Sequence, residues 1–123
     1  MFKIKFSELN NKTKATYYKK NWNMWRLMNK HNKKSFCIIY NDFIEKNILK
    51  KISGNALKLY IFLLSNSKNE TGESWYTIDS IALYFGKSKR TISYWINELE
   101  SLGLIKRMQL EFNKESHTYL QPY

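Results

Sequence analysis

Three basic side chains follow a glycine in the most regularly patterned stretch of the chain, "IDSIALYFGKSKRTISYWINELESLG". Lys87, Lys89 and Arg90 come after Gly86, and Ser88 stands between the two lysines. Ammonium and guanidinium groups bind anionic oxygens, and Arg can bind two acceptors at once. Because Ser favours the helix N-cap, the first amides of a helix that starts here are also available to an anion. The stretch therefore has the chemistry of an anion-binding site.

The residues after Ser88 predict a helix with two different faces. At about 100° per residue, its apolar face contains Ile92, Trp95, Ile96, Leu99 and Leu102. Its polar face contains Arg90, Ser93, Tyr94, Asn97 and Ser101. Such a helix keeps one side in a protein core and presents the other side outward. Glu98 and Glu100 lie late on the helix and off the centre of the polar face, where we expect their negative charges to weaken anion binding little.

The flanking sequence predicts the elements that would hold this helix in place. Ser53 and Thr77 are predicted N-caps, while Gly86 and Gly103 fit the left-handed position after a helix end. After Gly103, two apolar–polar segments joined by "NKE" predict a β-hairpin. In chain order we predict a strand (1–6), a loop (10–14), a helix (16–30), a strand (35–40), a helix capped by Asp42 (43–51), a helix (54–67), a short strand (74–77), two helices (78–85 and 89–102) and the hairpin strands (104–112 and 116–121).

This order of elements, with "TIDSIALYFGKSKRTISYWINELESLGLIKR" at its centre, resembles a winged helix-turn-helix domain over residues 44–123. The expected fold class is mainly α with a small β-sheet (α+β). The lead-in "ILKKISGNALKLYIFLL" is similar to small DNA-binding, replication or transfer proteins of plasmids and conjugative elements in low-GC Gram-positive bacteria. Residues 1–43 are then a basic N-terminal extension, which we expect to pack on the core.

The resemblance implies that the helix after Gly86 lies in the major groove of DNA, which just admits an α-helix. Arg90 can bind a guanine edge or a phosphate, and Asn97 can pair with adenine. Tyr94 is left open between a DNA contact and a dimer contact. The predicted DNA-binding residues, which would otherwise be solvated surface groups, are Thr77, Lys87, Ser88, Lys89, Arg90, Thr91, Ser93, Tyr94, Asn97, Lys106, Arg107, Asn113 and Lys114.

Most of the positive charge lies outside this stretch. The chain has 21 basic and 10 acidic residues, and residues 1–53 alone carry 13 basic and 3 acidic side chains. A codon bias toward Lys would explain part of the excess but not the shortage of carboxylates, so we expect a polyanionic partner. The N-terminal segment either supplies phosphate contacts or is a dimerising extension that is basic by bias. The candidate residues for contacts to the sugar–phosphate backbone of DNA are Lys3, Lys5, Lys19, Lys20, Lys33 and Lys34.

The sequence does not predict an enzyme. His31 and His117 have no Cys or carboxylate at a useful spacing, and Cys37 stands alone. We therefore expect no catalytic residue, no metal and no cofactor. The apolar run "LYIFLL" is too short to span a bilayer, and the first residues do not read as a secretory signal. A cytoplasmic protein without a membrane partner is the expectation.

These observations favour a sequence-specific double-stranded DNA-binding protein of a mobile element. It would recognise an origin or operator, as an accessory factor for plasmid transfer or replication or as a transcriptional regulator. We expect a homodimer, because one such domain covers few base pairs, and other proteins of a replication or transfer complex as further partners. The alternative is a winged-helix protein–protein interaction module without DNA binding.

Overall fold

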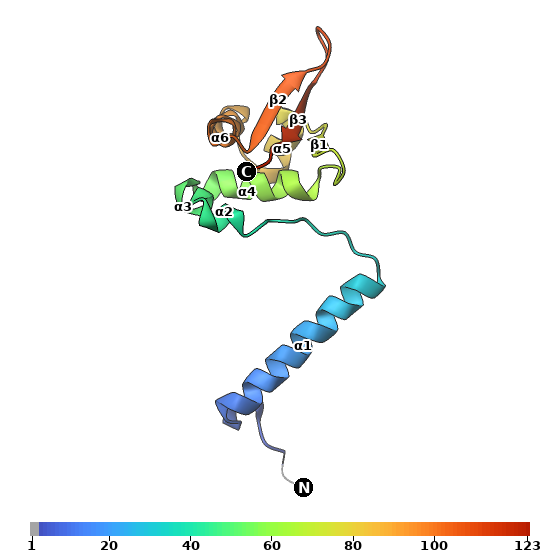
Figure 1. Cartoon of the computed structure of the whole chain (residues 1–123), viewed down its shortest axis with the longest axis vertical. Helices are drawn as coiled ribbons and strands as arrows, with labels where there is room; N and C mark the ends of the chain where they lie inside the picture. The colour runs from blue at the N-terminus through green and yellow to red at the C-terminus, as the bar shows by residue number, and fades with distance from the viewer. Residues whose placement is uncertain (1–2) are drawn as a thin grey trace. The chain divides into compact units, whose positions relative to one another are not determined.

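The computed structural model describes residues 3–123, and the chain divides into two compact units (Figure 1). The first unit, Met1–Phe36, contains a 3-10 helix, η1 (Phe6–Glu8), and a long helix, α1 (Asn11–His31). The second unit, Cys37–Tyr123, contains α2 (Asp42–Glu45), α3 (Ile48–Lys51), α4 (Gly54–Ser65), β1 (Glu73–Ser74), α5 (Ile78–Phe85), α6 (Lys89–Ser101), β2 (Ile105–Gln109) and β3 (Ser116–Leu120).

The strand predicted at the beginning of the chain does not form in the described residues. Phe2 lies outside them, and Lys3–Lys5 are irregular. Phe6 begins η1 instead, and its ring centroid lies 5.1 Å from that of Tyr17 and 5.6 Å from that of Tyr18. An isolated strand leaves its backbone groups without partners, so contact with the aromatic side chains of α1 decides the local structure.

The loop predicted before α1 is also wrong. The helix already begins at Asn11, because the side chain of Asn10 accepts a hydrogen bond from the Thr13 amide at 2.8 Å. The strand predicted at 35–40 is irregular as well. There the Tyr40 amide donates to the hydroxyl of Tyr123 at 2.9 Å. A side chain distant in sequence thus replaces the strand partner.

The helix predicted at 43–51 is interrupted. Asn47 has φ = 61°, in the left-handed region, and separates α2 from α3. Asp42 is the first residue of α2 rather than its N-cap, a position that Asn41 occupies without a side-chain cap bond. The interruption accompanies burial of Phe43, whose ring stacks on that of Tyr60 at 5.4 Å.

Three helices, α4, α5 and α6, form the centre of the second unit. The caps predicted for α4 and α5 are confirmed, since Ser53 accepts from the Ala56 amide and Thr77 from the Ser80 amide. The core consists of buried side chains from these helices and their flanks: Phe43, Ile52, Ala56, Leu59, Tyr60, Leu63, Ile81, Ala82, Ile92, Trp95, Ile96, Leu99, Leu104 and Ile105.

The buried face of α4 differs in part from the face that the spacing of its apolar residues predicts, which consists of Ala56, Leu57, Tyr60, Ile61 and Leu64. Ala56 and Tyr60 are buried as expected, but Ile61 is exposed. Leu59 and Leu63 are buried in its place. An almost wholly apolar helix offers several possible inward faces, so the packing of α4 on α6 selects among them.

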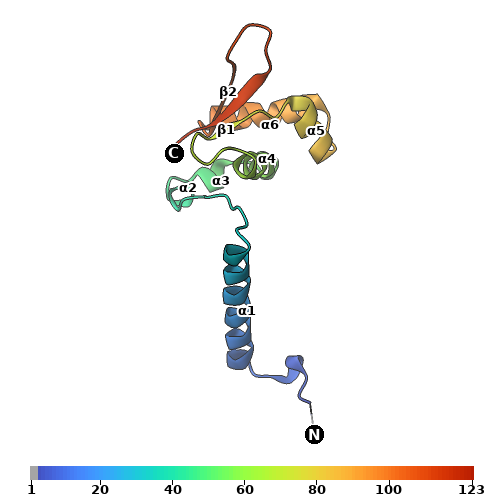
Figure 2. The same ribbon diagram turned by 90° about the vertical axis from the view of Figure 1, so that its right-hand side faces the viewer.

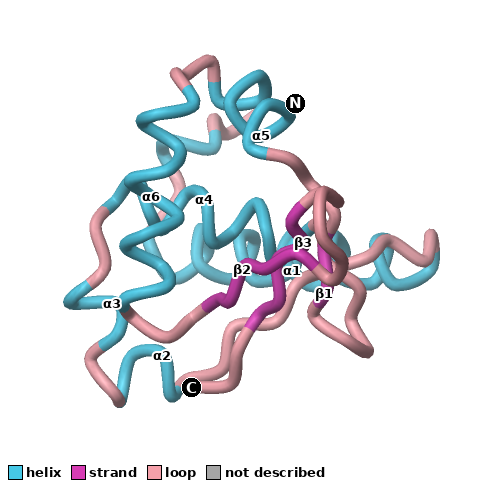
Figure 3. The backbone as a smooth tube through the Cα atoms, turned by 90° about the horizontal axis from the view of Figure 1, so that it is seen from above, coloured by secondary structure: helices cyan, strands magenta, loops and turns pink. Residues whose placement is uncertain are grey.

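The strands form an antiparallel sheet in the order β1–β3–β2. The predicted hairpin is confirmed, with Arg107 opposite Thr118 in the register of β2 and β3. α6 runs from α5 to the start of the hairpin (Figure 3). The hairpin projects beyond the helices (Figure 2). The predicted winged helix-turn-helix arrangement, mainly α with a small sheet, is therefore the observed fold of the second unit.

Candidate nucleic-acid interface

The turn between α5 and α6 is held by its own backbone. Gly86 has φ = 63°, and its amide donates to the carbonyl of Leu83 at 3.3 Å. The Lys87 amide donates to the carbonyl of Ala82 at 3.0 Å. This pair of bonds satisfies the last carbonyls of α5 and redirects the chain sharply. The left-handed glycine predicted here is confirmed.

The start of α6 is capped and positively charged. Ser88 accepts a hydrogen bond from the Thr91 amide at 3.1 Å and also lies 3.0 Å, Oγ to Oγ1, from the Thr91 hydroxyl. Lys87, Lys89 and Arg90 are all exposed around this cap. The structure therefore brings the three predicted cations together at the N-terminal end of a helix, where the macrodipole also favours an anion.

The two faces of α6 are separated as predicted. Ile92, Trp95, Ile96 and Leu99 are buried, and Leu102 is partly buried against the core. Arg90, Tyr94 and Asn97 are exposed, whereas Ser93 and Thr91 are half-buried. A rigid helix whose inner side is fixed by the core presents its outer side chains in a defined arrangement.

Arg90 lies against the side chain one turn further along α6. Its Nε donates to the Tyr94 hydroxyl at 3.2 Å, and its guanidinium carbon lies 5.7 Å from the centroid of the Tyr94 ring. Only Nε is used in this hydrogen bond, so the two Nη groups can donate to acceptors outside the chain. Tyr94 thus orients Arg90, a role that the sequence reasoning did not assign to it.

Lys89 forms an ion pair with Asp79 in the first turn of α5, with 2.7 Å between Nζ and Oδ1. Both side chains are about two-thirds exposed, and such a pair contributes about 0–1 kcal/mol. A phosphate oxygen can therefore compete with Asp79 for this ammonium group. Sequence reasoning missed Asp79, because an acidic residue near a helix start does not reveal which residue of the next helix it will meet.

A groove of about 480 Å³ runs between the start of α5, the first half of α6 and the hairpin. Four predicted DNA-binding residues line it: Thr77, Lys89, Ser93 and Arg107. Asp79 and Glu115 also line the groove. Donor groups from three separate elements thus converge on one concave surface, although the two carboxylates reduce its positive charge.

Arg107 is half-buried and hydrogen-bonded within its own domain. One of its terminal nitrogens, Nη1, donates to Thr118 Oγ1 at 2.7 Å and to the carbonyl of Tyr76 at 3.2 Å. Burial lowers the pKa of Arg107, and the charge of Glu100 opposes that shift. Because side chains alternate along a strand, the exposed Lys106 points to the other face of the sheet. The sequence predicted these two hairpin residues as equivalent, but the structure gives Arg107 a structural contact.

The predicted contacts at the tip of the hairpin are exposed. Asn113 adopts φ = 62°, and the Lys114 amide donates to the carbonyl of Glu111 at 3.2 Å, which closes a tight turn. Glu111 and Glu115 flank Lys114, so the tip has mixed charge. This makes the hairpin a weaker electrostatic attractor for DNA than the start of α6.

The basic residues predicted for backbone contacts outside the second unit are exposed as well. Lys3, Lys5, Lys19, Lys20, Lys33 and Lys34 belong to the first unit. Lys19 and Lys20 lie in the middle of α1, and Lys33 has φ = 53° after its end. Their contact with DNA stays a prediction.

Glu98 has a role that the sequence reasoning did not find. Its two carboxylate oxygens accept from Ser53, one from the amide at 2.7 Å and one from the hydroxyl at 2.8 Å. Since Ser53 caps α4, Glu98 ties α6 to the beginning of α4. The two residues are 45 positions apart, so no local sequence signal could have indicated this bond.

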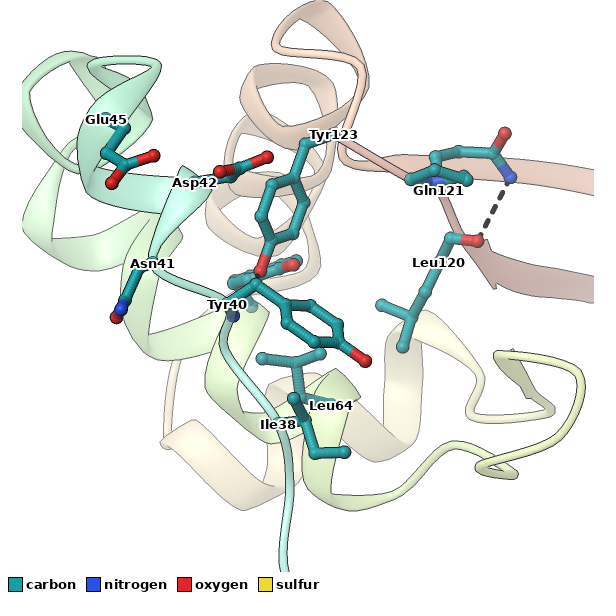
Figure 4. Close-up of a pocket in the computed structure, with 11 residues that line it drawn as sticks. Ile38, Tyr40, Asn41, Asp42, Glu45, Leu64, Leu120, Gln121 and Tyr123 are labelled. Atoms are coloured by element: carbon teal, nitrogen blue, oxygen red, sulfur yellow. Dashed lines mark hydrogen bonds between the residues drawn. The ribbon is translucent and has the colours of Figure 1, made fainter.

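A larger hollow, of about 610 Å³, is lined by residues outside α6 (Figure 4). Its walls include Ile38, Tyr40, Leu120 and Tyr123. Tyr60 also lines this hollow, and its pKa is raised to about 12. Burial is the main cause, and the neighbouring Tyr123 adds to it. A phenol with a raised pKa is a poor acid–base catalyst near neutral pH.

His117 pairs with Glu73, with 3.0 Å between Nδ1 and Oε2, and this hydrogen bond lowers the pKa of Glu73. Within residues 3–123, no group of three or more His, Cys, Asp or Glu side chains is placed to hold a metal ion. In the same range, no helix has the length and apolarity needed to cross a membrane.

Comparison with known proteins agrees with the fold. A family model described as a helix-turn-helix domain matches residues 50–105. A solved structure described as "Structure of Rep-DNA complex" is similar to this chain, with a TM-score of 0.54 and 17% identity over 76% of this chain and 79% of that one. At this identity the likeness concerns the fold. No curated protein matches the chain.

Proposed function

We propose that this protein binds double-stranded DNA sequence-specifically, with α6 in the major groove. The observation that carries the proposal is the two-sidedness of α6. Ile92 and Leu99 are fully buried, while Arg90 and Asn97 are exposed. Guanidinium and amide side chains have the donor and acceptor geometry that reads guanine and adenine edges. The solved structure of similar fold, described as a Rep–DNA complex, supports DNA as the partner.

The finer proposal concerns its biological setting. A small basic chain with one such domain is suited to marking an origin or operator so that other proteins assemble there. We place it on a plasmid or conjugative element, in the cytoplasm, where it acts in replication, transfer or transcription. Two copies on a repeated or palindromic site would double the base contacts, and this favours a homodimer.

Footprinting on DNA that flanks its own gene tests this function. We expect a protected site whose affinity falls when Arg90 and Asn97 are replaced by Ala. Ser101→Ala, an exposed position on the same helix, is the matched control and should leave the footprint unchanged. Binding to no duplex even at low ionic strength, where phosphate contacts are strongest, would refute the proposal.

One observation favours the alternative, a protein–protein interaction module. Leu83 and Tyr84 on α5 are exposed, Leu83 to 85%, and Leu83 lines a hollow of about 460 Å³ beside the turn. If DNA does not bind, this apolar surface becomes the candidate interface. Leu83→Ala separates the two functions, because it leaves the charge around the neighbouring Lys87 and Lys89 unchanged and should weaken a protein contact far more than DNA binding.

A further inference from the structure

α1 has two chemically opposite sides. At about 100° per residue, one half of its circumference carries six large side chains, which we call the aromatic face: Tyr17, Tyr18, Trp22, Met24, Trp25 and Met28. The other half carries Lys12, Lys19, Lys20, Arg26 and Lys30. The helix contains no acidic residue. Charge on one side with aromatic surface on the other is typical of a helix that covers its apolar side against a partner.

The aromatic face is large enough to matter energetically. Each of its six side chains is 51–61% exposed, and the Trp22 and Trp25 rings lie side by side at 5.0 Å. Since an aromatic side chain buries about 150–250 Å², the face offers on the order of 600 Å² per copy. Two such faces in contact would bury roughly 1,200 Å², the lower limit of specific interfaces.

We propose that α1 is the dimerisation helix, and that the aromatic faces of two copies pack against each other. The midpoint of α1 carries the argument for a second copy. Asn21 lies at the centre of the 21-residue helix, within the arc between Met28 and Trp25. In a two-fold symmetric pair, parallel or antiparallel, the central residue meets its own copy. Two Asn side chains can exchange hydrogen bonds there, as a polar residue does in a coiled-coil seam.

The polar residues within this arc argue against a lipid surface as the occupant. Lys14, Asn21 and Asn29 all fall between the aromatic residues. Asn29 donates to the Trp25 carbonyl at 2.9 Å, and Lys14 Nζ donates to the Ser7 carbonyl at 3.1 Å. Asn21, however, would enter the acyl region of a membrane, where a polar group is costly without a partner. A protein seam accommodates them, because Asn21 meets its copy and Lys14 lies near the end of the helix.

The charge of α1 sets the sign of the salt dependence. Two copies bring like charges together, and dissolved ions screen that repulsion. Self-association should therefore strengthen as salt rises, whereas binding to DNA or to an anionic membrane weakens. This inference deepens the proposed function by naming the surface that joins two copies, and its readout does not depend on DNA binding.

Sedimentation of the full-length chain, at concentrations on the order of 1–100 µM, provides the first test. We expect a reversible dimer that tightens from about 0.05 M to about 0.5 M salt. Trp25→Ala should weaken it at least tenfold, as expected for a central aromatic anchor. Leu27→Ala is the matched control, since Leu27 is equally exposed but lies on the other side of α1. A monomer under all these conditions, or equal effects of both variants, would overturn the proposal.

A cross-link tests the location of the seam. In a Cys37→Ser background, Asn21→Cys should form a covalent dimer under mild oxidation whichever way the helices run. Asn23→Cys, on the basic side, should not do so.

Binding to vesicles that contain phosphatidylglycerol tests the competing possibility, a membrane surface as the partner of α1. If they bind the chain through Trp22 and Trp25 while no dimer forms, the partner is a membrane surface and the proposal is wrong. A dimer without DNA binding would refute the proposed function and leave this inference intact.

Discussion

Two amphipathic helices of this chain have opposite environments. α6 buries Ile92, Trp95, Ile96 and Leu99, whereas no residue of α1 is buried. Both helices have an apolar side and basic residues. The difference teaches that periodicity predicts a two-sided helix but does not identify what covers it. For α6 the cover is the domain core; for α1 we propose a second copy.

The sharpest test of this contrast compares two tryptophans. Trp95 of α6 is 7% exposed and Trp25 of α1 is 56% exposed. Trp95→Ala should lower the free energy of unfolding by about 3–5 kcal/mol, because it leaves a cavity in the core. Trp25→Ala should change it by less than about 0.5 kcal/mol in dilute, monomeric protein. Urea unfolding followed by circular dichroism measures both, and equal losses would mean that α1 is packed like α6.

A second comparison concerns the charge of the two units. Replacing Lys19, Lys20, Lys33 and Lys34 by Gln should reduce the slope of log K against log salt for DNA binding by about 3–4, at about 0.9 per phosphate lost. The control replaces four exposed lysines of the second unit, Lys46, Lys50, Lys51 and Lys58, and should change the slope less. An unchanged slope in the first variant would show that these lysines of the first unit do not bind DNA phosphates.

Two arginines separate base reading from phosphate binding. Arg90→Ala in α6 should weaken binding to the preferred site by about 1–3 kcal/mol and relax sequence preference at one position. Arg26→Ala in α1 should weaken binding to all sequences alike. Fluorescence anisotropy with the footprinted site and a scrambled duplex distinguishes the two. If Arg26 altered sequence preference and Arg90 did not, the assignment of α6 as the reading helix would be wrong.

The smallest expected effect concerns the bond that joins α6 to α4. Glu98→Gln removes the charge that accepts two hydrogen bonds from Ser53 and should cost about 1 kcal/mol of unfolding free energy. Ser101→Ala, an exposed position on the same helix, is the control and should cost less than about 0.5 kcal/mol. Thermal unfolding detects the difference. Equal melting temperatures would show that this link contributes nothing to the stability of the second unit.

Local signals in the sequence predicted the helix pair well. Thr77, Gly86, Ser88 and Gly103 each occupy the cap or left-handed position assigned to them. These residues act through hydrogen bonds to the nearest few amides or through their own backbone freedom. Their neighbours in sequence are therefore sufficient to predict where each helix begins or ends. The inner face of α6 was predictable for a similar reason, because its apolar residues fall on one stripe.

Other features depended on residues far away in the chain. Within the described residues, the strands predicted at the start of the chain and at 35–40 do not form, because an alternating pattern needs a neighbouring strand that the pattern itself does not supply. The helix predicted at 43–51 is interrupted at Asn47, and Phe43, in the part before the interruption, packs on the distant Tyr60. Arg107 was predicted as a DNA contact, but its hydrogen bonds to Tyr76 and Thr118 were not predicted. Only the register of the sheet brings these residues close to Arg107.

The sequence by itself determined the caps and the tight turn after α5, which follow from interactions within a few residues. It also determined which side of α6 is polar, which follows from the spacing of the apolar residues. Only the tertiary structure decided the groove that joins Thr77, Ser93 and Arg107, the pairing of Lys89 with Asp79, and the tie from Glu98 to α4. The physical reason is range: a hydrogen bond or ion pair forms only when packing of the whole core brings distant atoms within about 3 Å.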